Sequence, residues 1–230
     1  MTQAPKDPTL TSMDPRHPHG FPVPARAERI ADWAVQGTGL LLAVAGAALL
    51  TTFAALYLAA DRVAALSVYA GALVLTFLAS VLYHALPWGR LRPALRRLDH
   101  AAIYLKIAGT YTPLVALAGG AFAWGLLLVV WLLALGGAAL RLLRGGDPGR
   151  LGVWLYLVLG WLGVLVAWPL ASAAPLATLL LVGLGGLLYT LGVPFFAARR
   201  LRYSTAIWHG FVLLASGCFF AAIAVGSFSA

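Results

Sequence analysis

The chain contains long apolar runs that follow one another with only short polar breaks between them. A helix needs about 20 predominantly apolar residues to cross roughly 30 Å of hydrocarbon, and these runs approach or exceed that length. We predict seven membrane-spanning helices, at Trp33–Leu58, Val63–Leu86, Ala101–Ala118, Phe122–Leu140, Leu151–Ala171, Leu176–Ala197 and Thr205–Val225. The fold class that follows is an all-α membrane protein, a seven-helix bundle whose backbone polar groups are satisfied within each helix.

The composition supports a membrane protein and excludes several other classes. Apolar residues make up 62% of the chain and charged residues 10%, whereas a soluble domain carries roughly a quarter charged residues. The formal charge of +9 does not indicate nucleic-acid binding, because the basic residues lie in short clusters between apolar runs and form no basic face. We therefore expect membrane lipids and no nucleic acid as partners. The single cysteine, Cys218, excludes an internal disulfide and a cysteine-based zinc site.

Two regions are expected. Residues 1–30 carry prolines every few positions and almost no apolar run, so they cannot bury enough surface to offset the entropy lost on ordering. We predict that they form a disordered, proline-rich cytoplasmic tail. Residues 31–230 are predicted to form the seven-helix transmembrane domain.

The basic residues predict how the bundle is oriented. Fourteen Lys and Arg residues lie before the first span or in the connections on that same side, against Arg62 alone on the other side. The fourteen are Lys6, Arg16, Arg26, Arg29, Arg90, Arg92, Arg96, Arg97, Arg141, Arg144, Arg150, Arg199, Arg200 and Arg202. Cytoplasmic loops are enriched in Lys and Arg, so we predict a cytoplasmic amino terminus and an external carboxyl terminus. The expected location is the cell inner (plasma) membrane, which the chain crosses several times.

Polar residues at membrane depth are candidates for a functional site, because each one is costly there without a partner. Ser80 and His84 end the second predicted span, Asp99 and His100 precede the third, and His209 lies one turn into the seventh. All of these elements meet the cytoplasmic side in the predicted topology. Two interpretations remain open: a shared polar pocket, or histidines that snorkel or form ordinary hydrogen bonds between helices.

Several motifs, in this order along the chain, resemble a known family. They are Glu28–Ala31 (ERIA), Ser80–His84 (SVLYH), Leu98–Tyr104 (LDHAAIY), Ile107–Pro113 (IAGTYTP), Gly185–Gly192 (GGLLYTLG) and Ile207–His209 (IWH). With these motifs the chain resembles the hemolysin III family, the bacterial branch of the progestin and adiponectin receptor superfamily. The resemblance covers nearly everything after the tail.

The resemblance implies a zinc ion near the cytoplasmic side of the bundle. The family's ligands are a histidine in a Ser-x-x-x-His motif on helix two and a His-x-x-x-His pair on helix seven, and an aspartate opening helix three holds the zinc-bound water. By motif, the metal ligands here are His84 and His209, and the catalytic residues are Asp99 and Ser80. The first histidine of the helix-seven pair is replaced by Thr205, so the zinc site is expected to be incomplete.

Three positions depart from the family pattern. Thr205 points the same way as His209, but a neutral hydroxyl is a poor zinc ligand, and Asp99 could move in to complete a set of two histidines and one carboxylate. Gln36 stands where relatives often carry histidine. Lys106 stands where an apolar residue is expected; its ammonium either snorkels to the interface or lies beside the pocket and supplies the positive charge that a metal would have brought.

Three functions are compatible with these observations. The first is a zinc-dependent hydrolase of a lipid amide or ester, since the wider relatives include ceramidases. The second is a receptor or membrane-homeostasis protein that senses lipid in the same pocket without turnover. The third is a cytolytic, channel-forming protein, which we rank last as a mechanism because no span shows the polar stripe that a wide aqueous pore needs.

Overall fold

The computed structural model describes residues 25–85, 89–144, 149–198 and 201–229, and the predicted tail over residues 1–24 lies outside them. All regular structure in the described part is helical, as predicted. The helices are α1 (Arg26–Tyr57), α2 (Ala60–Ala85), α3 (Arg92–Ala118), α4 (Gly120–Arg144), α5 (Gly149–Trp161), α6 (Val164–Ala173), α7 (Leu176–Ala197) and α8 (Ser204–Phe228). Seven spans in these residues are long and apolar enough to cross a membrane, with α5 and α6 sharing the fifth.

Two helices begin more than one turn earlier than their apolar runs predict. Helix α1 starts at Arg26, inside the predicted tail, because Glu28 accepts a hydrogen bond from the backbone N–H of Ala25 and caps the first turn. Residues 26–30, which were predicted to belong to the tail, are therefore the first residues of α1. Helix α3 starts at Arg92, and Pro93 in its first turn lacks the N–H that such a position leaves unpaired. Asp99 consequently lies two turns inside α3 and does not open it.

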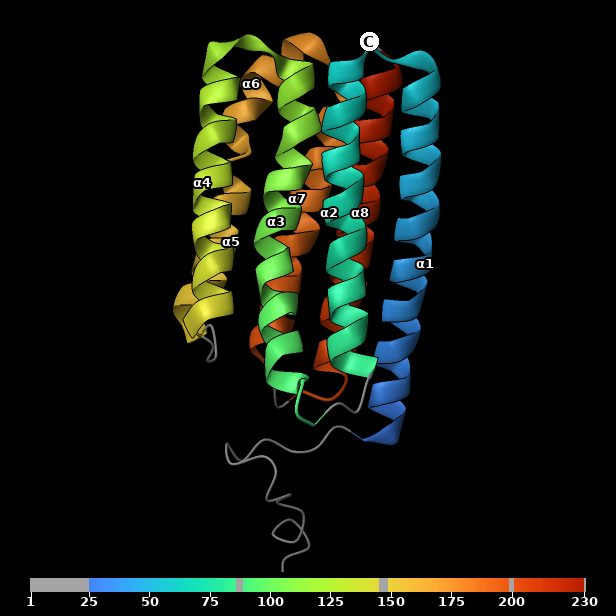
Figure 1. Cartoon of the computed structure of the whole chain (residues 1–230), viewed down its shortest axis with the longest axis vertical. Helices are drawn as coiled ribbons and strands as arrows, with labels where there is room; N and C mark the ends of the chain where they lie inside the picture. The colour runs from blue at the N-terminus through green and yellow to red at the C-terminus, as the bar shows by residue number, and fades with distance from the viewer. Residues whose placement is uncertain (1–24, 86–88, 145–148, 199–200, 230) are drawn as a thin grey trace, which may run out of the picture.

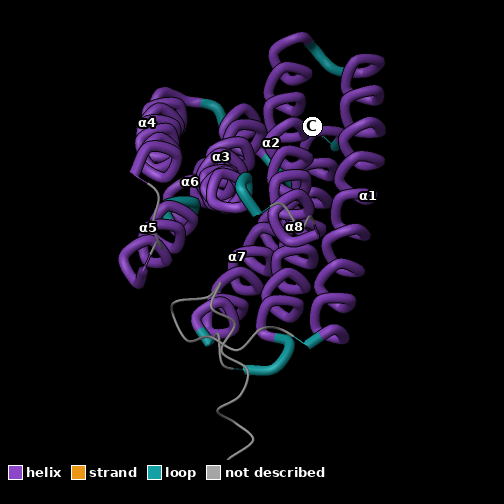
Figure 2. Tube along the Cα trace, turned by 60° about the horizontal axis from the view of Figure 1, so that its bottom comes forward, coloured by secondary structure: helices purple, strands orange, loops and turns teal. Residues whose placement is uncertain are grey.

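Helix α3 occupies the centre of the bundle. The helices α1 to α4 pack as consecutive neighbours, while α8 packs between α1 and α7 (Figures 1 and 2). Helix α3 contacts α2, α4, α6 and α8, and its most apolar window is the most buried of the seven spans, at 56%. Polar residues on α3 are thereby held away from lipid.

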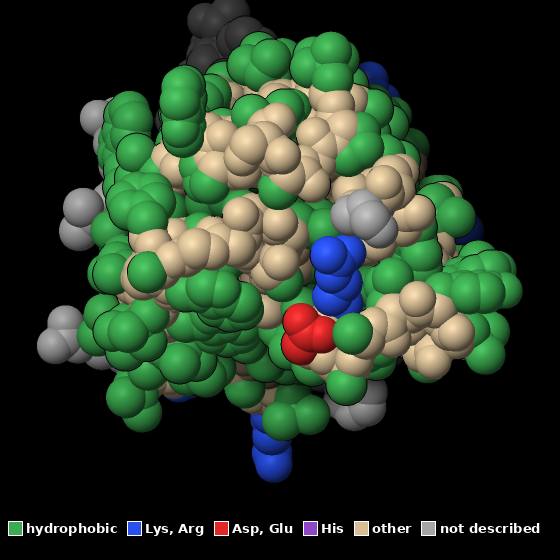
Figure 3. All heavy atoms as spheres, turned by 90° about the horizontal axis from the view of Figure 1, so that it is seen from above, with side chains coloured by type: hydrophobic (Ala, Val, Ile, Leu, Met, Phe, Trp, Pro, Cys, Tyr) green, Lys and Arg blue, Asp and Glu red, His purple; other side chains and the backbone are tan. Residues whose placement is uncertain are grey.

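The two ends of the bundle differ in charge. Figure 3 looks onto the end that carries the α1–α2 and α3–α4 connections, and almost all of that surface is apolar or uncharged. The opposite end, where α1, α3 and α8 begin, carries basic residues that include Arg29, Arg92, Arg96 and Arg202. We call it the basic end.

The fifth span is broken at Leu162 and Gly163, where the helical hydrogen bonding is interrupted. The hydroxyl of Tyr111, on α3, donates to the backbone carbonyls of Leu159 (2.9 Å) and Gly160 (2.8 Å) just before the break. A side chain at Gly163 would meet that same hydroxyl at 3.1 Å. At the break, the N–H of Gly163 bonds to Gly160 and not to Leu159, and the hydroxyl of Tyr111 gives the carbonyl of Leu159 a partner on α3.

Candidate metal centre

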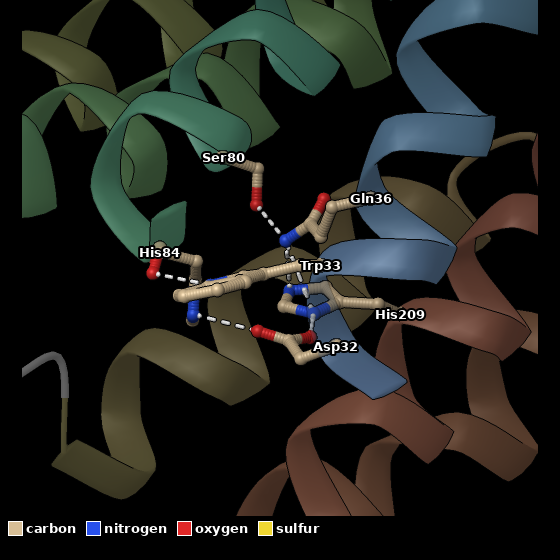
Figure 4. Close-up of polar contacts among 6 residues, drawn as sticks. All are labelled: Asp32, Trp33, Gln36, Ser80, His84 and His209. Carbon is tan, nitrogen blue, oxygen red and sulfur yellow. Dashed lines mark hydrogen bonds and ion pairs between the residues drawn. The ribbon is translucent and has the colours of Figure 1, made fainter. Parts of the chain in front are cut away.

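Three side chains that could bind a metal converge near the basic end, as Figure 4 shows. Asp32 comes from α1, His84 from the last turn of α2 and His209 from the second turn of α8. One ligand atom from each of the three residues lies within 4.8 Å of the others. Asp32 and His209 are buried, with 6% and 9% of their surfaces exposed, so protein rather than bulk water surrounds them.

The carboxylate of Asp32 bridges the two histidines. Its Oδ1 lies 2.6 Å from Nδ1 of His209, and its Oδ2 lies 3.1 Å from Nδ1 of His84. The two imidazole rings meet edge to face, with their centroids 4.8 Å apart. One carboxylate thus brings together histidines from two different helices.

Gln36 and Ser80 extend this cluster. The amide Nε2 of Gln36 donates to Oγ of Ser80 at 2.7 Å and lies 3.1 Å from both ring nitrogens of His209. Because Nδ1 of His209 donates its hydrogen to Asp32, Nε2 is the nitrogen that accepts from Gln36. Asp32 and Gln36 are four residues apart on α1, as are Ser80 and His84 on α2, so each helix turns two polar residues to the same side.

Helices α1 and α2 are also joined at this end by a second contact. The indole Nε1 of Trp33 donates to the backbone carbonyl of His84 at 3.0 Å (Figure 4). That carbonyl lies in the last turn of α2 and has no partner within its own helix. The bond therefore holds the end of α2 that carries His84 against α1.

The residues singled out in the sequence lie in different parts of this arrangement. His84 and His209 come together, and Ser80 is linked to His209 through Gln36. Asp99 is buried and lines the same cavity, but it is not part of the three-residue group. Thr205 also lines the cavity, one turn before His209.

Asp32 is the functional candidate that the sequence analysis missed. The first span was predicted to begin at Trp33, which left Asp32 one residue outside the membrane. An acidic residue one turn before Gln36 would have drawn attention once the helix was extended back to Arg26. Asp32 is a third candidate ligand beside the two histidines. The group therefore has three candidate ligands, although Thr205 stands where a third histidine was expected.

The group lies on the wall of a cavity of about 1620 Å³ inside the bundle. Asp32, Gln36, Ser80, His84, Asp99, Lys106 and His209 all line it. Near the basic end the wall also carries Arg29, Arg92, Arg96 and Arg202, while Leu114, Val166, Leu170 and Leu179 line it further away. The cavity therefore changes from polar and basic at one end to apolar at the other, which is the pattern that fits an amphiphile.

Residues 35–220 match the family model described as Haemolysin-III related. This chain belongs to the hemolysin III-related family. The hemolysin III-related chain is 36% identical over 194 residues to the hemolysin-3 homolog of Bacillus subtilis (strain 168), covering 84% of this chain and 91% of that protein. It is 34% identical to hemolysin-3 of Bacillus cereus, covering 84% and 89%, and 30% identical to the human monocyte to macrophage differentiation factor, covering 68% and 67%.

The donor atoms of the hemolysin III-related chain fit a divalent transition metal. Two imidazoles and one carboxylate are the protein ligands of several catalytic zinc sites, which leave further positions to water or substrate. The same set is also used by non-haem iron. A metal would take the lone pair of Nδ1 of His209, the nitrogen that faces Asp32. Nε2 would then carry the hydrogen, and the amide of Gln36 beside it could present its oxygen as the acceptor, which is the kind of partner that metal-binding histidines usually have. Asp32, His84 and His209 therefore form a candidate metal centre, although their geometry does not identify the metal.

Proposed function

We propose that this protein is a zinc-dependent hydrolase of lipid amides or esters in the bacterial inner membrane, with its basic end facing the cytoplasm. One observation carries the proposal: a buried group of two histidines and one carboxylate lies on the wall of a large cavity that is polar at one end and apolar at the other. An acyl chain would fill the apolar part and place the amide or ester carbonyl beside the group. The excess of basic residues at one end supports the orientation.

Each polar residue has a distinct part in this proposal. Asp32, His84 and His209 would hold the metal, which when bound supplies Lewis acidity and lowers the pKa of water. Gln36 fixes the orientation of His209, and Ser80 positions Gln36. The carboxylate of Asp99 would accept a proton from water attacking the carbonyl carbon and return it to the leaving nitrogen or oxygen, so that a fatty acid and an amine or alcohol are released.

A second candidate function is a lipid receptor or membrane-homeostasis protein without turnover. It is favoured by the contacts that Asp32 already makes, since both of its carboxylate oxygens pair with histidines. Such a network is satisfied without a metal and could respond to a lipid that displaces one histidine. The two candidates differ in whether purified protein holds metal and consumes substrate.

The test measures metal content and hydrolysis in the same preparations. Protein purified in detergent is analysed for all first-row transition metals and then assayed with an N-acyl long-chain amine and with phosphatidylcholine. We expect about one zinc per chain and release of free fatty acid. Asp32→Asn should lose zinc and activity together, whereas Asp99→Asn should keep zinc and lose activity at least a hundredfold.

Asp61→Asn is the matched control, because Asp61 is an exposed carboxylate at the opposite end. It should change neither measurement. Metal-free protein that folds normally and shows no hydrolysis would overturn the hydrolase and favour the receptor. Stoichiometric iron would overturn the choice of zinc.

A further inference from the structure

A second polar group lies deeper along the same cavity, around Lys106, and three of its four residues (Lys106, Tyr189 and Phe77) line the cavity wall. Lys106 is seven residues beyond Asp99 on α3, and Ser216 is seven residues beyond His209 on α8, so both lie roughly 10 Å further from the basic end. Tyr189, on α7, and Phe77, on α2, complete the group. These four residues, which we call the Lys106 group, belong to four different helices.

Within the described part of the chain, the polar and aromatic partners of Lys106 are neutral groups. Its Nζ donates to Oγ of Ser216 at 2.6 Å and lies 5.1 Å from the ring centroid of Phe77 and 5.2 Å from that of Tyr189. The hydroxyl oxygens of Tyr189 and Ser216 are 3.3 Å apart, and Ser216 donates to the carbonyl of Val212. No carboxylate among the described residues forms an ion pair with Lys106.

In this arrangement no partner neutralises the positive charge of Lys106, and its ammonium has more N–H donors than Ser216 accepts. Only 6% of the surface of Lys106 is exposed, and the residue lies near the middle of its span. An ammonium at that depth is energetically costly, and long basic side chains usually extend toward the membrane interface instead. The two aromatic rings stabilise the ammonium but do not neutralise its charge. An ammonium has three N–H donors and Ser216 takes one.

We infer that the Lys106 group binds the anionic head of a single-chain amphiphile, with a long-chain fatty acid as the ligand class. The ammonium of Lys106 would pair with the carboxylate, and the hydroxyl of Tyr189 could donate a second hydrogen bond. Beyond Lys106 the cavity wall is mostly apolar, at Leu114, Val166 and Leu170 for example, which fits a ligand that carries an alkyl chain. An amphiphile with its head at Lys106 would extend its chain away from the basic end.

Charge alone does not distinguish a carboxylate from a phosphate monoester, because a lysine binds both as a point charge. Both are anions that an alkyl chain can carry, and the experiment separates them. The inference concerns binding and does not depend on the hydrolase. It can therefore be tested in Asp32→Asn protein, where the proposed activity is absent.

The test compares three ligands that share a 16-carbon chain: palmitate, hexadecyl phosphate and hexadecanol. Binding of each is measured on purified protein in neutral detergent by displacement of radiolabelled palmitate. The unmodified protein should bind palmitate at least tenfold more tightly than hexadecanol. Lys106→Met should remove this preference and leave hexadecanol binding unchanged, while Lys106→Arg should retain it.

Arg62→Met is the control, since it removes a positive charge at the opposite end of the bundle and should change nothing. If Lys106→Met does not fold, Lys106→Gln and the shift in melting temperature of unmodified protein with each ligand give the same comparison. Tighter binding of hexadecyl phosphate than of palmitate would replace the fatty acid by a phosphate monoester. Equal binding of palmitate and hexadecanol, or full palmitate affinity in Lys106→Met, would overturn the site.

Discussion

At the scale of single residues, the candidate centre depends on how Asp32 shares its carboxylate between two histidines. Each oxygen has one imidazole partner, and both partners come from other helices. Replacing Asp32 would leave two largely buried imidazoles without their acceptor, while replacing either histidine would leave one carboxylate oxygen unpaired. The three side chains therefore depend on one another, and substitutions of neighbouring residues are easier to interpret than substitutions of the three themselves.

Gln36 provides such a test. Gln36→Leu removes the hydrogen bond to Nε2 of His209 and keeps a side chain of similar size, so the imidazole should lose its fixed orientation. We expect metal affinity to fall about 10- to 100-fold with one site per chain retained. Competition with a calibrated chelator measures the change. Ser80→Ala, which acts only through Gln36, should cost less, and an affinity unchanged in Gln36→Leu would contradict the role given to Gln36.

Thr205 provides the opposite test. Thr205→His adds an imidazole one turn before His209, and Thr205 lines the same cavity. We expect metal to be held at least tenfold more tightly in the same chelator competition, because a fourth ligand becomes available. Thr205→Ala should bind metal as the unmodified protein does. A histidine at this position that leaves the affinity unchanged would show that residue 205 does not face the three ligands.

At the scale of helices, the positions of the polar residues depend on close packing between α2 and α3. A Cβ built at Gly109, on α3, would lie 2.7 Å from Cβ of Ala72, on α2, and neither atom can rotate away. The absence of a side chain at Gly109 lets the two helices approach, as small residues do in membrane proteins. His84 is carried by one of these helices, and Asp99 and Lys106 by the other.

Gly109→Ala should therefore destabilise the bundle. Overpacking costs about 1 to 3 kcal/mol, which over most of this range exceeds the gain of about 1 kcal/mol in helix propensity. Gly71→Ala is the control, because Gly71 on α2 has open space around it and only the propensity gain applies. Thermal unfolding in detergent should give a lower melting temperature for Gly109→Ala than for Gly71→Ala. The reverse order would mean that the helices separate at little cost.

At the scale of the whole molecule, the unequal charge of the two ends predicts the topology. A reporter enzyme that is active only outside the cytoplasm should be active when fused to the carboxyl terminus. It should be inactive when inserted between Gly89 and Arg90, in the connection before α3 at the basic end. Cell fractions with matched expression of the two fusions give the measurement. Activity in the insertion and none in the carboxyl-terminal fusion would reverse the orientation.

The sequence alone determined the number of spans, their approximate limits and the difference in charge between the ends. These properties are local, because each helix satisfies its own backbone and lipid selects long apolar runs. Because the limits of a span fix how deep each of its residues lies in the membrane, the sequence also placed His84 and His209 at a similar depth. The ends of helices were less predictable: α1 and α3 extend beyond their apolar runs, since capping and proline placement set those ends.

Only the tertiary structure decided which polar residues meet. Asp32 and His209 are 177 positions apart, and Lys106 and Ser216 are 110 apart, so their contacts depend on how α1, α3 and α8 pack. Hydropathy gives the depth of a residue but not the direction in which it faces within the bundle. Asp32 was overlooked because the first span was predicted to begin one residue after it. The partners of Lys106 could not be chosen because several helices offer polar groups at that depth.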